Sequence, residues 1–168
     1  MKSASFLLSL FVLTSLPNIL LAQARPPVAA ADLVVRDAWM REATAGQAST
    51  SAYVVIENKS ATATALTSVD AAVAGTVELH TMKMTGGMSG MSGMGGDMMT
   101  MEKVPEVPIV ARSTVALKPG SFHIMLFKVS KAAPAGSTVD FTLHFTGGVT
   151  RTVTAKVLTR AATGLTTP

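Results

Sequence analysis

Methionine is concentrated in this chain in a way that core packing does not explain. The 168-residue sequence contains eleven methionines, and eight of them lie between Met82 and Met101. Methionine usually fills irregular gaps in a core. Three of the eight, Met88, Met91 and Met94, lie in the Gly-Met-Ser repeat of residues 86–96, which offers no apolar neighbours. Thioether sulfur suits Cu(I), so the cluster indicates a soft-metal role; the alternative is a linker whose methionines are incidental or scavenge oxidants.

A histidine stands beside part of this cluster, on a candidate strand at residues 76–84. Side chains alternate along a strand. Glu78, His80, Met82 and Met84 therefore share one face, and the valine and leucine between them form the other. A lone histidine on an outward strand face is usually a solvated polar residue. The interpretation of His80 as a metal ligand therefore depends on its methionine neighbours.

A second histidine has the same arrangement. His123 and Met125 are two residues apart on a candidate strand at residues 122–129, and the residues on its other face, Phe122, Ile124 and Leu126, are apolar. Their Cα atoms should lie about 6.5–7 Å apart, so both side chains can reach one ion. We expect the His/Met face to point outward, away from the core. The third histidine, His144, has no methionine partner, and we interpret it as structural.

The chain contains no cysteine. This excludes disulfides, thiolate metal sites and cysteine nucleophiles. It also excludes a blue-copper electron carrier, which needs a Cys thiolate. Metal chemistry in this chain must use histidine, methionine and carboxylates, and a set of imidazoles and thioethers favours Cu(I) over Zn(II).

The elements that must position these residues are predicted to be strands. Short segments rich in valine, isoleucine, threonine and aromatic residues recur at intervals of about ten residues, which is typical of an antiparallel sandwich or barrel. Gly147-Gly148 predicts a hairpin, residues 58–60 predict a turn, and residues 29–31 have room for one turn of helix. The glycine-rich residues 86–96 are expected to form a loop. The predicted strands are residues 33–40, 51–57, 66–72, 76–84, 99–104, 113–117, 122–129, 138–145 and 149–157.

The first 24 residues have the layout of a cleavable secretory signal. Lys2 precedes an apolar run, and Ala22-Gln23-Ala24 offers small residues for cleavage. A membrane anchor is the competing interpretation, but the run is short and is interrupted by Pro17. Residues 25–32 are interpreted as a linker. Losing Lys2 lowers the net charge from +4 to +3, without basic runs, which gives little support for nucleic-acid binding.

Three segments of the sequence form a distinctive set: Val-Glu-Leu-His-Thr-Met at 77–82, Met-Glu-Lys-Val at 101–104, and Leu-Lys-Pro-Gly-Ser-Phe-His-Ile-Met-Leu at 117–126. Together they resemble a known family, the PCu(A)C copper chaperones of the bacterial periplasm. The resemblance covers nearly all of the chain after the signal. It implies an all-β, cupredoxin-like Greek-key antiparallel β-sandwich, formed by a single domain at residues 33–160 with a tail at 161–168.

The resemblance also implies the copper ligands, which are His80, Met101, His123 and Met125. In the family a Met follows the first His by about ten residues, and a His-x-Met follows after about twenty-one more. Met101 and His123 match the second interval, but twenty residues separate His80 from Met101. An insertion at residues 86–96 accounts for the excess, and Met91 is the alternative ligand. Candidate accessory ligands are Met82, Met84, Met88, Met91, Met94, Met98 and Met99.

The function that the resemblance implies is that of a periplasmic copper chaperone and not an enzyme. Cu(I) is the expected cargo, and acceptance of Cu(II) stays open. The implied acceptor is a cytochrome c oxidase subunit, at its copper A centre, or another copper assembly chaperone. No stable membrane insertion is expected after signal cleavage. The alternative is a copper storage or detoxification protein without a dedicated client.

Overall fold

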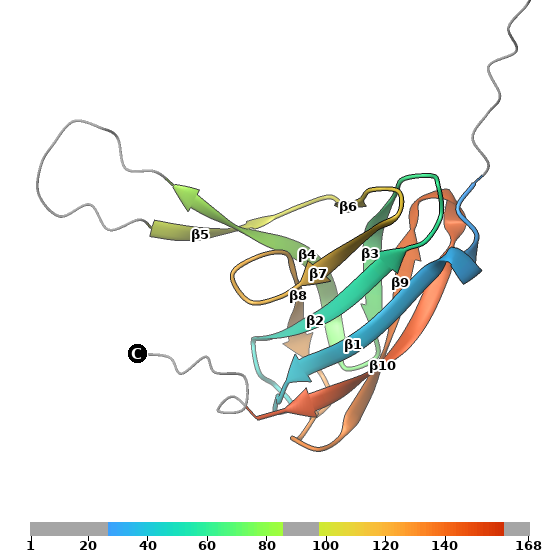
Figure 1. Ribbon diagram of the computed structural model, residues 1–168. Helices are drawn as coiled ribbons and strands as arrows, with labels where there is room; N and C mark the ends of the chain where they lie inside the picture. Colours follow the sequence, from blue (N-terminus) through green and yellow to red (C-terminus); the bar gives the residue numbers. More distant parts are fainter. Residues whose placement is uncertain (1–26, 86–97, 160–168) are drawn as a thin grey trace, which may run out of the picture.

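Ten β-strands account for most of the residues that the computed structural model describes, 27–85 and 98–159 (Figure 1). Their bounds are β1 (Leu33–Arg41), β2 (Ser49–Asn58), β3 (Thr64–Ala71), β4 (Ala74–Thr85), β5 (Met98–Lys103), β6 (Val107–Ile109), β7 (Ser113–Leu117), β8 (His123–Val129), β9 (Thr138–Phe145) and β10 (Thr150–Leu158). The predicted strands are therefore confirmed to within a few residues. β6 was not predicted, because Pro108 lowers strand propensity; such a proline is tolerated on an edge strand, and β6 lies at one end of the strand order.

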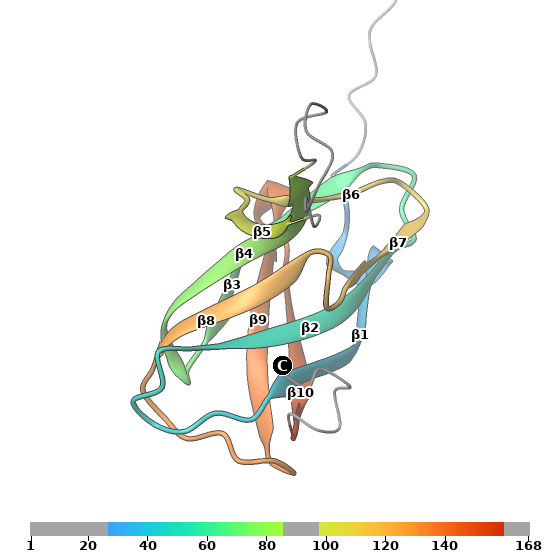
Figure 2. The same cartoon turned by 90° about the vertical axis from the view of Figure 1, so that its left-hand side faces the viewer.

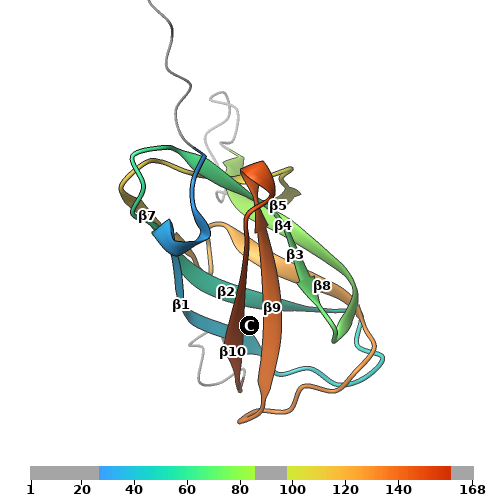
Figure 3. The same cartoon turned by 90° about the vertical axis from the view of Figure 1, so that its right-hand side faces the viewer.

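The strands pair in the order β5-β4-β8-β2-β1-β10-β9-β3-β6, and β7 pairs with β2. β8 is inserted between β4 and β2, both of which are far from it in the sequence, as in a Greek-key arrangement. One pair departs from the antiparallel expectation: β1 and β10 run parallel, with Trp39 opposite Lys156. This pair joins the layer of β4, β8, β2 and β1 to the layer of β10, β9 and β3 (Figures 2 and 3).

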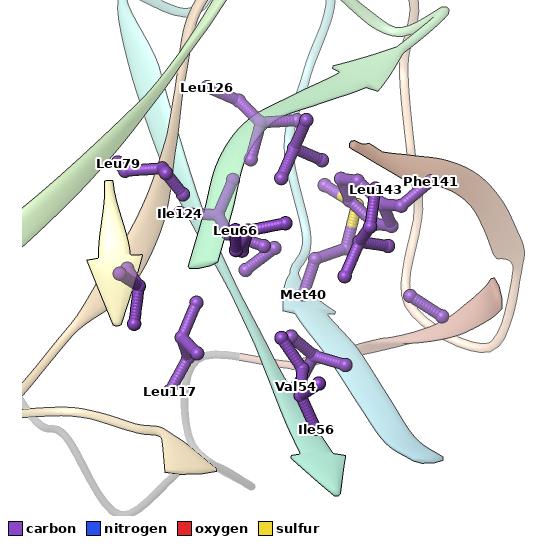
Figure 4. Close-up of a cluster of buried hydrophobic side chains, with 14 of the residues drawn as sticks. Met40, Val54, Ile56, Leu66, Leu79, Leu117, Ile124, Leu126, Phe141 and Leu143 are labelled. Atoms are coloured by element: carbon purple, nitrogen blue, oxygen red, sulfur yellow. The ribbon is translucent and has the colours of Figure 1, made fainter. Parts of the chain in front are cut away.

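Apolar side chains from both layers meet between them (Figure 4). The core-facing residues of β4 and β8, Leu79, Ile124 and Leu126, are almost completely buried, as alternation predicted. Full burial of one such side chain stabilises the fold by about 1.5–3 kcal/mol. This packing holds β4 and β8 side by side, and the opposite face of the same two strands carries the histidines.

A β-bulge in β1 determines which residues of β1 lie on the same face of the sheet as the histidines. The register against β2 shifts between Arg36 and Trp39, and Asp37 has a φ of 53°. An extra residue in one strand reverses the alternation beyond it. Met40 is consequently buried in the core, while Trp39 stacks on Tyr53 with ring centroids 4.2 Å apart.

The predicted turns are present. Gly147 and Gly148, with φ of 81° and 77°, connect β9 to β10 as a hairpin. A short 3-10 helix at Ala30–Asp32 lies where one turn of helix was expected, inside the predicted linker. Asn58, completely buried at the end of β2, donates to the carbonyls of Thr62 and Val110 at 2.9 and 3.2 Å. The signal (1–24), the tail (161–168) and the loop at 86–96 lie outside the described residues.

Candidate metal site

The strand register brings the two histidines together. His80 of β4 lies directly opposite His123 of β8, and their ring centroids are 6.0 Å apart. Imidazole nitrogens bind metal ions at about 2.0–2.1 Å, so this separation is compatible with one ion bound by a nitrogen of each ring. The expectation that both histidines share a face is therefore confirmed, and the register makes them direct neighbours.

Thioethers lie beside this pair, on the neighbouring β4–β5 ladder and on β8. Met82 of β4 lies opposite Met101 of β5, two residues beyond His80. Met125 lies on the same face of β8 as His123. A pocket of about 390 Å³ is lined by Met82, Met101, His123 and Met125, together with residues of β1, β2 and the turn before β8.

His123 and Met125 are buried, so the expectation that they point to solvent is wrong. His123 is 6% exposed and Met125 is 8% exposed. Alternation correctly placed them on the face of the sheet opposite the core. That face is also covered, because Ser51 and Tyr53 of β2 and the turn before β8 line the same pocket. The pocket is therefore a recess and not an exposed surface, and Met101, which is 47% exposed, lies at its open side.

Hydrogen bonding leaves one nitrogen of His123 available. Its Nδ1–H donates to the carbonyl of Ser121 at 2.8 Å, so Nε2 carries the free lone pair in the neutral ring. Burial lowers the pKa of His123, and the bond to Ser121 opposes this only in part. A neutral imidazole with its other nitrogen held by a carbonyl is the form in which histidine binds metals.

His80 also has an available nitrogen. Its Nε2 lies 3.0 Å from Oε2 of Glu78, and its Nδ1 is buried with no hydrogen-bond partner in the described part of the chain. Buried polar atoms are almost always satisfied, and an exception calls for an explanation such as a ligand or an ion. An ion bound at Nδ1 of His80 would supply the missing partner.

The recess is lined by the imidazole of His123 and the sulfurs of Met82, Met101 and Met125, and the imidazole of His80 lies opposite His123 on β4. These donors are soft and neutral. Such donors suit Cu(I). Within residues 27–85 and 98–159, no three His, Asp or Glu side chains gather as they would for a harder ion. Among the named ligands Met101 is the most exposed, and Met82, expected only as an accessory, lines the recess beside it.

The remaining candidate methionine ligands divide into two groups. The β4–β5 hairpin extends beyond the body of the sandwich (Figure 1). On it Met84 pairs with Met99 and Thr85 pairs with Met98, and Met99 is 49% exposed. The accessory candidates Met88 and Met94, and the alternative ligand Met91, lie outside the described residues.

Sequence reasoning missed the role of Glu78. The carboxylate accepts from His80 and, through Oε1, from Nζ of Lys103 at 2.7 Å. Lys103 and, to a smaller extent, His80 lower the pKa of Glu78. Alternation had already placed Glu78 on the histidine face, but its partner Lys103 comes from another strand. His144, interpreted as structural, pairs with Asp70 at 2.7 Å between β9 and β3.

The fold and the site together define a class, the cupredoxin-like β-sandwich proteins with a thiolate-free histidine and methionine site. The model of the family described as "Putative lipoprotein LpqE-like" matches residues 33–157. The chain belongs to this PCuAC-like family, which confirms the resemblance seen in the sequence. Among curated proteins, no sequence matches the chain.

Solved structures agree with this assignment. The Cu(I)-bound solution structure of DR1885 from Deinococcus radiodurans is 33% identical, with a TM-score of 0.53 over 82% of this chain and 81% of that protein. The copper-bound PCuAC domain of PmoF2 has a TM-score of 0.61 over 78% of this chain and 96% of that domain, at 21% identity. The second likeness supports the cupredoxin-like fold. In the described residues, no helix is long and apolar enough to cross a membrane.

Proposed function

We propose that this protein is an exported, non-enzymatic copper chaperone that binds Cu(I) with His80, Met101, His123 and Met125. The observation that carries the proposal is the rung formed by His80 and His123. Within the described residues, Nδ1 of His80 has no hydrogen-bond partner, and Nε2 of His123 carries the lone pair of the neutral ring. Met101 and Met125 line a recess together with His123. The similar protein DR1885 has been solved with Cu(I) bound, which supports copper as the cargo.

The accessibility of the ligands suits transfer by ligand exchange. His123 and Met125 hold the ion from the buried side, and Met101 binds it from the exposed side. An acceptor ligand can displace the exposed thioether first, while the buried ligands keep the ion bound. Because no thiolate is present, an acceptor that offers cysteine thiolates will hold Cu(I) more tightly than this site does.

The acceptor that we propose, on the family resemblance, is the copper A centre of cytochrome c oxidase or another copper assembly chaperone. The proposed compartment is the periplasm, reached by cleavage of the signal at residues 1–24. Membership of an LpqE-like lipoprotein family supports export. This chain has no cysteine to carry a lipid, so we propose that the mature protein is not anchored in this way.

X-ray absorption on the Cu(I)-loaded mature protein tests the site. We expect two nitrogen and two sulfur neighbours, with an additional sulfur if Met82 joins the set. His144→Ala should leave this spectrum unchanged, because His144 pairs with Asp70 away from the recess. A spectrum with sulfur neighbours alone would refute the imidazole ligands.

Transfer kinetics test the chaperone role against storage. Cu(I)-loaded protein is mixed with a soluble apo copper A domain, and metal transfer is followed by absorbance. Transfer that accelerates with acceptor concentration supports ligand exchange. A rate equal to spontaneous dissociation at every acceptor concentration refutes the chaperone role; the extra methionines, including the exposed Met99, then fit storage better.

A further inference from the structure

Glu78 and Lys103 form a polar network behind His80. Glu78 lies two residues before His80 on β4 and presents its carboxylate to the ring, with Oε2 3.0 Å from Nε2. Lys103, the register partner of His80 on β5, donates to the other carboxylate oxygen at 2.7 Å. Both oxygens of Glu78 are therefore engaged on the side of His80 away from its unpartnered nitrogen.

We propose that Glu78 is a positioning residue that holds His80 in the Nε2–H tautomer, so that Nδ1 is the nitrogen that binds Cu(I). The proposal rests on the proposed function and assigns a role to a residue outside the ligand set. Glu78 acts through His80 and does not touch the ion.

The proton between the two groups must belong to the ring. An ionised carboxylate only accepts hydrogen bonds, so the contact exists when Nε2 carries the hydrogen. In a neutral imidazole the other nitrogen then has the lone pair. That nitrogen, Nδ1, is the buried atom of His80 that lacks a partner in the described chain. The contact with Glu78 therefore accounts for both observations: Nε2 carries the hydrogen, and Nδ1 has a lone pair without a partner.

Lys103 holds the carboxylate in this geometry. Its ammonium binds Oε1 and leaves Oε2 directed at the ring. It also balances the negative charge of Glu78. A carboxylate released from this pair would place a hard oxygen donor beside the soft ligands, and such donors favour other ions. The pair therefore supports selectivity for Cu(I) as well as ring orientation.

The chain offers matched controls. Asp70 and His144 form a carboxylate–histidine pair of the same chemistry at 2.7 Å, on β3 and β9. Glu102 and Lys83 form a carboxylate–lysine pair on the same hairpin. Asp70→Ala removes a histidine partner away from the site, and Glu102→Ala removes a hairpin ion pair without touching His80.

The first measurement is the tautomer of His80 in the apo mature protein, by long-range ¹H–¹⁵N NMR above the pH at which the ring is protonated. In the unchanged protein we expect Nε2 protonated and Nδ1 unprotonated. Glu78→Ala should give a mixture of both tautomers. Glu78→Gln should retain the Nε2–H form only in part, because its single amide oxygen must accept from both the ring and Lys103. Observation of an Nδ1–H tautomer in the unchanged apo protein would overturn the proposal.

The second measurement is Cu(I) affinity by anaerobic competition with a chromophoric chelator. Loss of an outer hydrogen-bond partner of a metal-binding histidine typically weakens binding 10–100-fold. We expect a loss of about this size for Glu78→Ala, a smaller loss for Glu78→Gln, and none for Asp70→Ala or Glu102→Ala. Addition of Cu(I) should shift the ¹⁵N resonance of Nδ1 of His80 more than that of Nε2.

Two failures are distinguishable. If His123→Ala weakens Cu(I) binding but Glu78→Ala changes neither affinity nor tautomer, the role of Glu78 is refuted and the copper site stands. If His123→Ala leaves affinity unchanged, the proposed function is refuted, and the apo tautomer still decides whether Glu78 orients His80. Circular dichroism of each variant checks that the sandwich is folded.

Discussion

Replacement of His123 by alanine should affect both stability and copper binding, because this side chain is buried and a proposed ligand. It is 6% exposed and donates to the carbonyl of Ser121 at 2.8 Å. Loss of the hydrogen bond costs about 1 kcal/mol, and the space left by the ring adds about 1–2 kcal/mol. We therefore expect the apo variant to lose about 2–3 kcal/mol of unfolding free energy. For a domain of this size that lowers Tm by roughly 6–12 °C.

The effect of copper on Tm then separates the two roles of His123. At free Cu(I) about 100 times the Kd of the unchanged protein, binding adds about 2.7 kcal/mol to its stability. If the variant binds at least about 100-fold more weakly, its gain at the same concentration is about 0.4 kcal/mol or less. Removal of one ligand should weaken binding at least as much as the 10–100-fold loss seen for outer partners.

The assay is thermal unfolding by circular dichroism under anaerobic conditions, with free Cu(I) buffered by a chelator. His144→Ala is the control; its side chain is partly exposed and paired with Asp70 on other strands. It should keep the full copper-induced rise in Tm. A His123→Ala protein that is stabilised by Cu(I) as much as the unchanged protein would refute the ligand assignment. An unchanged apo Tm would refute the structural part of the reasoning.

Four further predictions concern other parts of the chain. Met101→Leu should weaken Cu(I) binding at least tenfold, and because Met101 is 47% exposed it should not move Tm by more than about 2 °C. The control Met99→Leu, at a residue that is 49% exposed, should change the affinity less. A larger loss of affinity for Met99→Leu in competition titrations would contradict the assignment. Burial lowers the pKa of His123 in the folded chain, so the unfolded chain takes up a proton first as the pH falls. Urea unfolding of the apo protein should therefore show a free energy of unfolding that decreases below about pH 6.5. If His123→Ala keeps the same dependence of stability on pH, another group is responsible. Asn58→Ala should lower the free energy of unfolding by about 2–4 kcal/mol in the same assay, because Asn58 is completely buried and its amide donates to two carbonyls that would lose their partner. A loss under about 1 kcal/mol would show that water replaces the amide. Deletion of residues 86–96 should retain one Cu(I) per chain by metal analysis; a stoichiometry of zero would assign a primary ligand to that loop.

The fold was largely predictable because its signals are local. Period-two alternation depends only on neighbouring residues, and it identified β4 and β8 together with their core residues Leu79, Ile124 and Leu126. The turn at Gly147-Gly148 was predictable for the same reason, since a positive φ is favourable for glycine. β6 was missed because its pairing with β3 depends on the tertiary environment and not on its own propensity.

Burial of the site was not predictable from alternation. The pattern separates the two faces of β8, but it does not say what covers each face. Ser51 and Tyr53 of β2 and the turn before β8 line the second face, and His123 and Met125 are buried there. The lowered pKa of His123 follows from this burial and could not be inferred from strand position alone.

The sequence by itself determined the chemistry available to this protein: imidazole and thioether donors, no thiolate, and a periodicity that places His80 with Met82 and His123 with Met125. Only the tertiary structure decided that these pairs meet. The register of β4 against β8 sets His80 opposite His123, and the register of β4 against β5 sets Met82 opposite Met101 and brings Lys103 to Glu78. Strand register is chosen by the packing of a core whose members are distant in sequence, because a slip of one residue would exchange its buried and ligand faces.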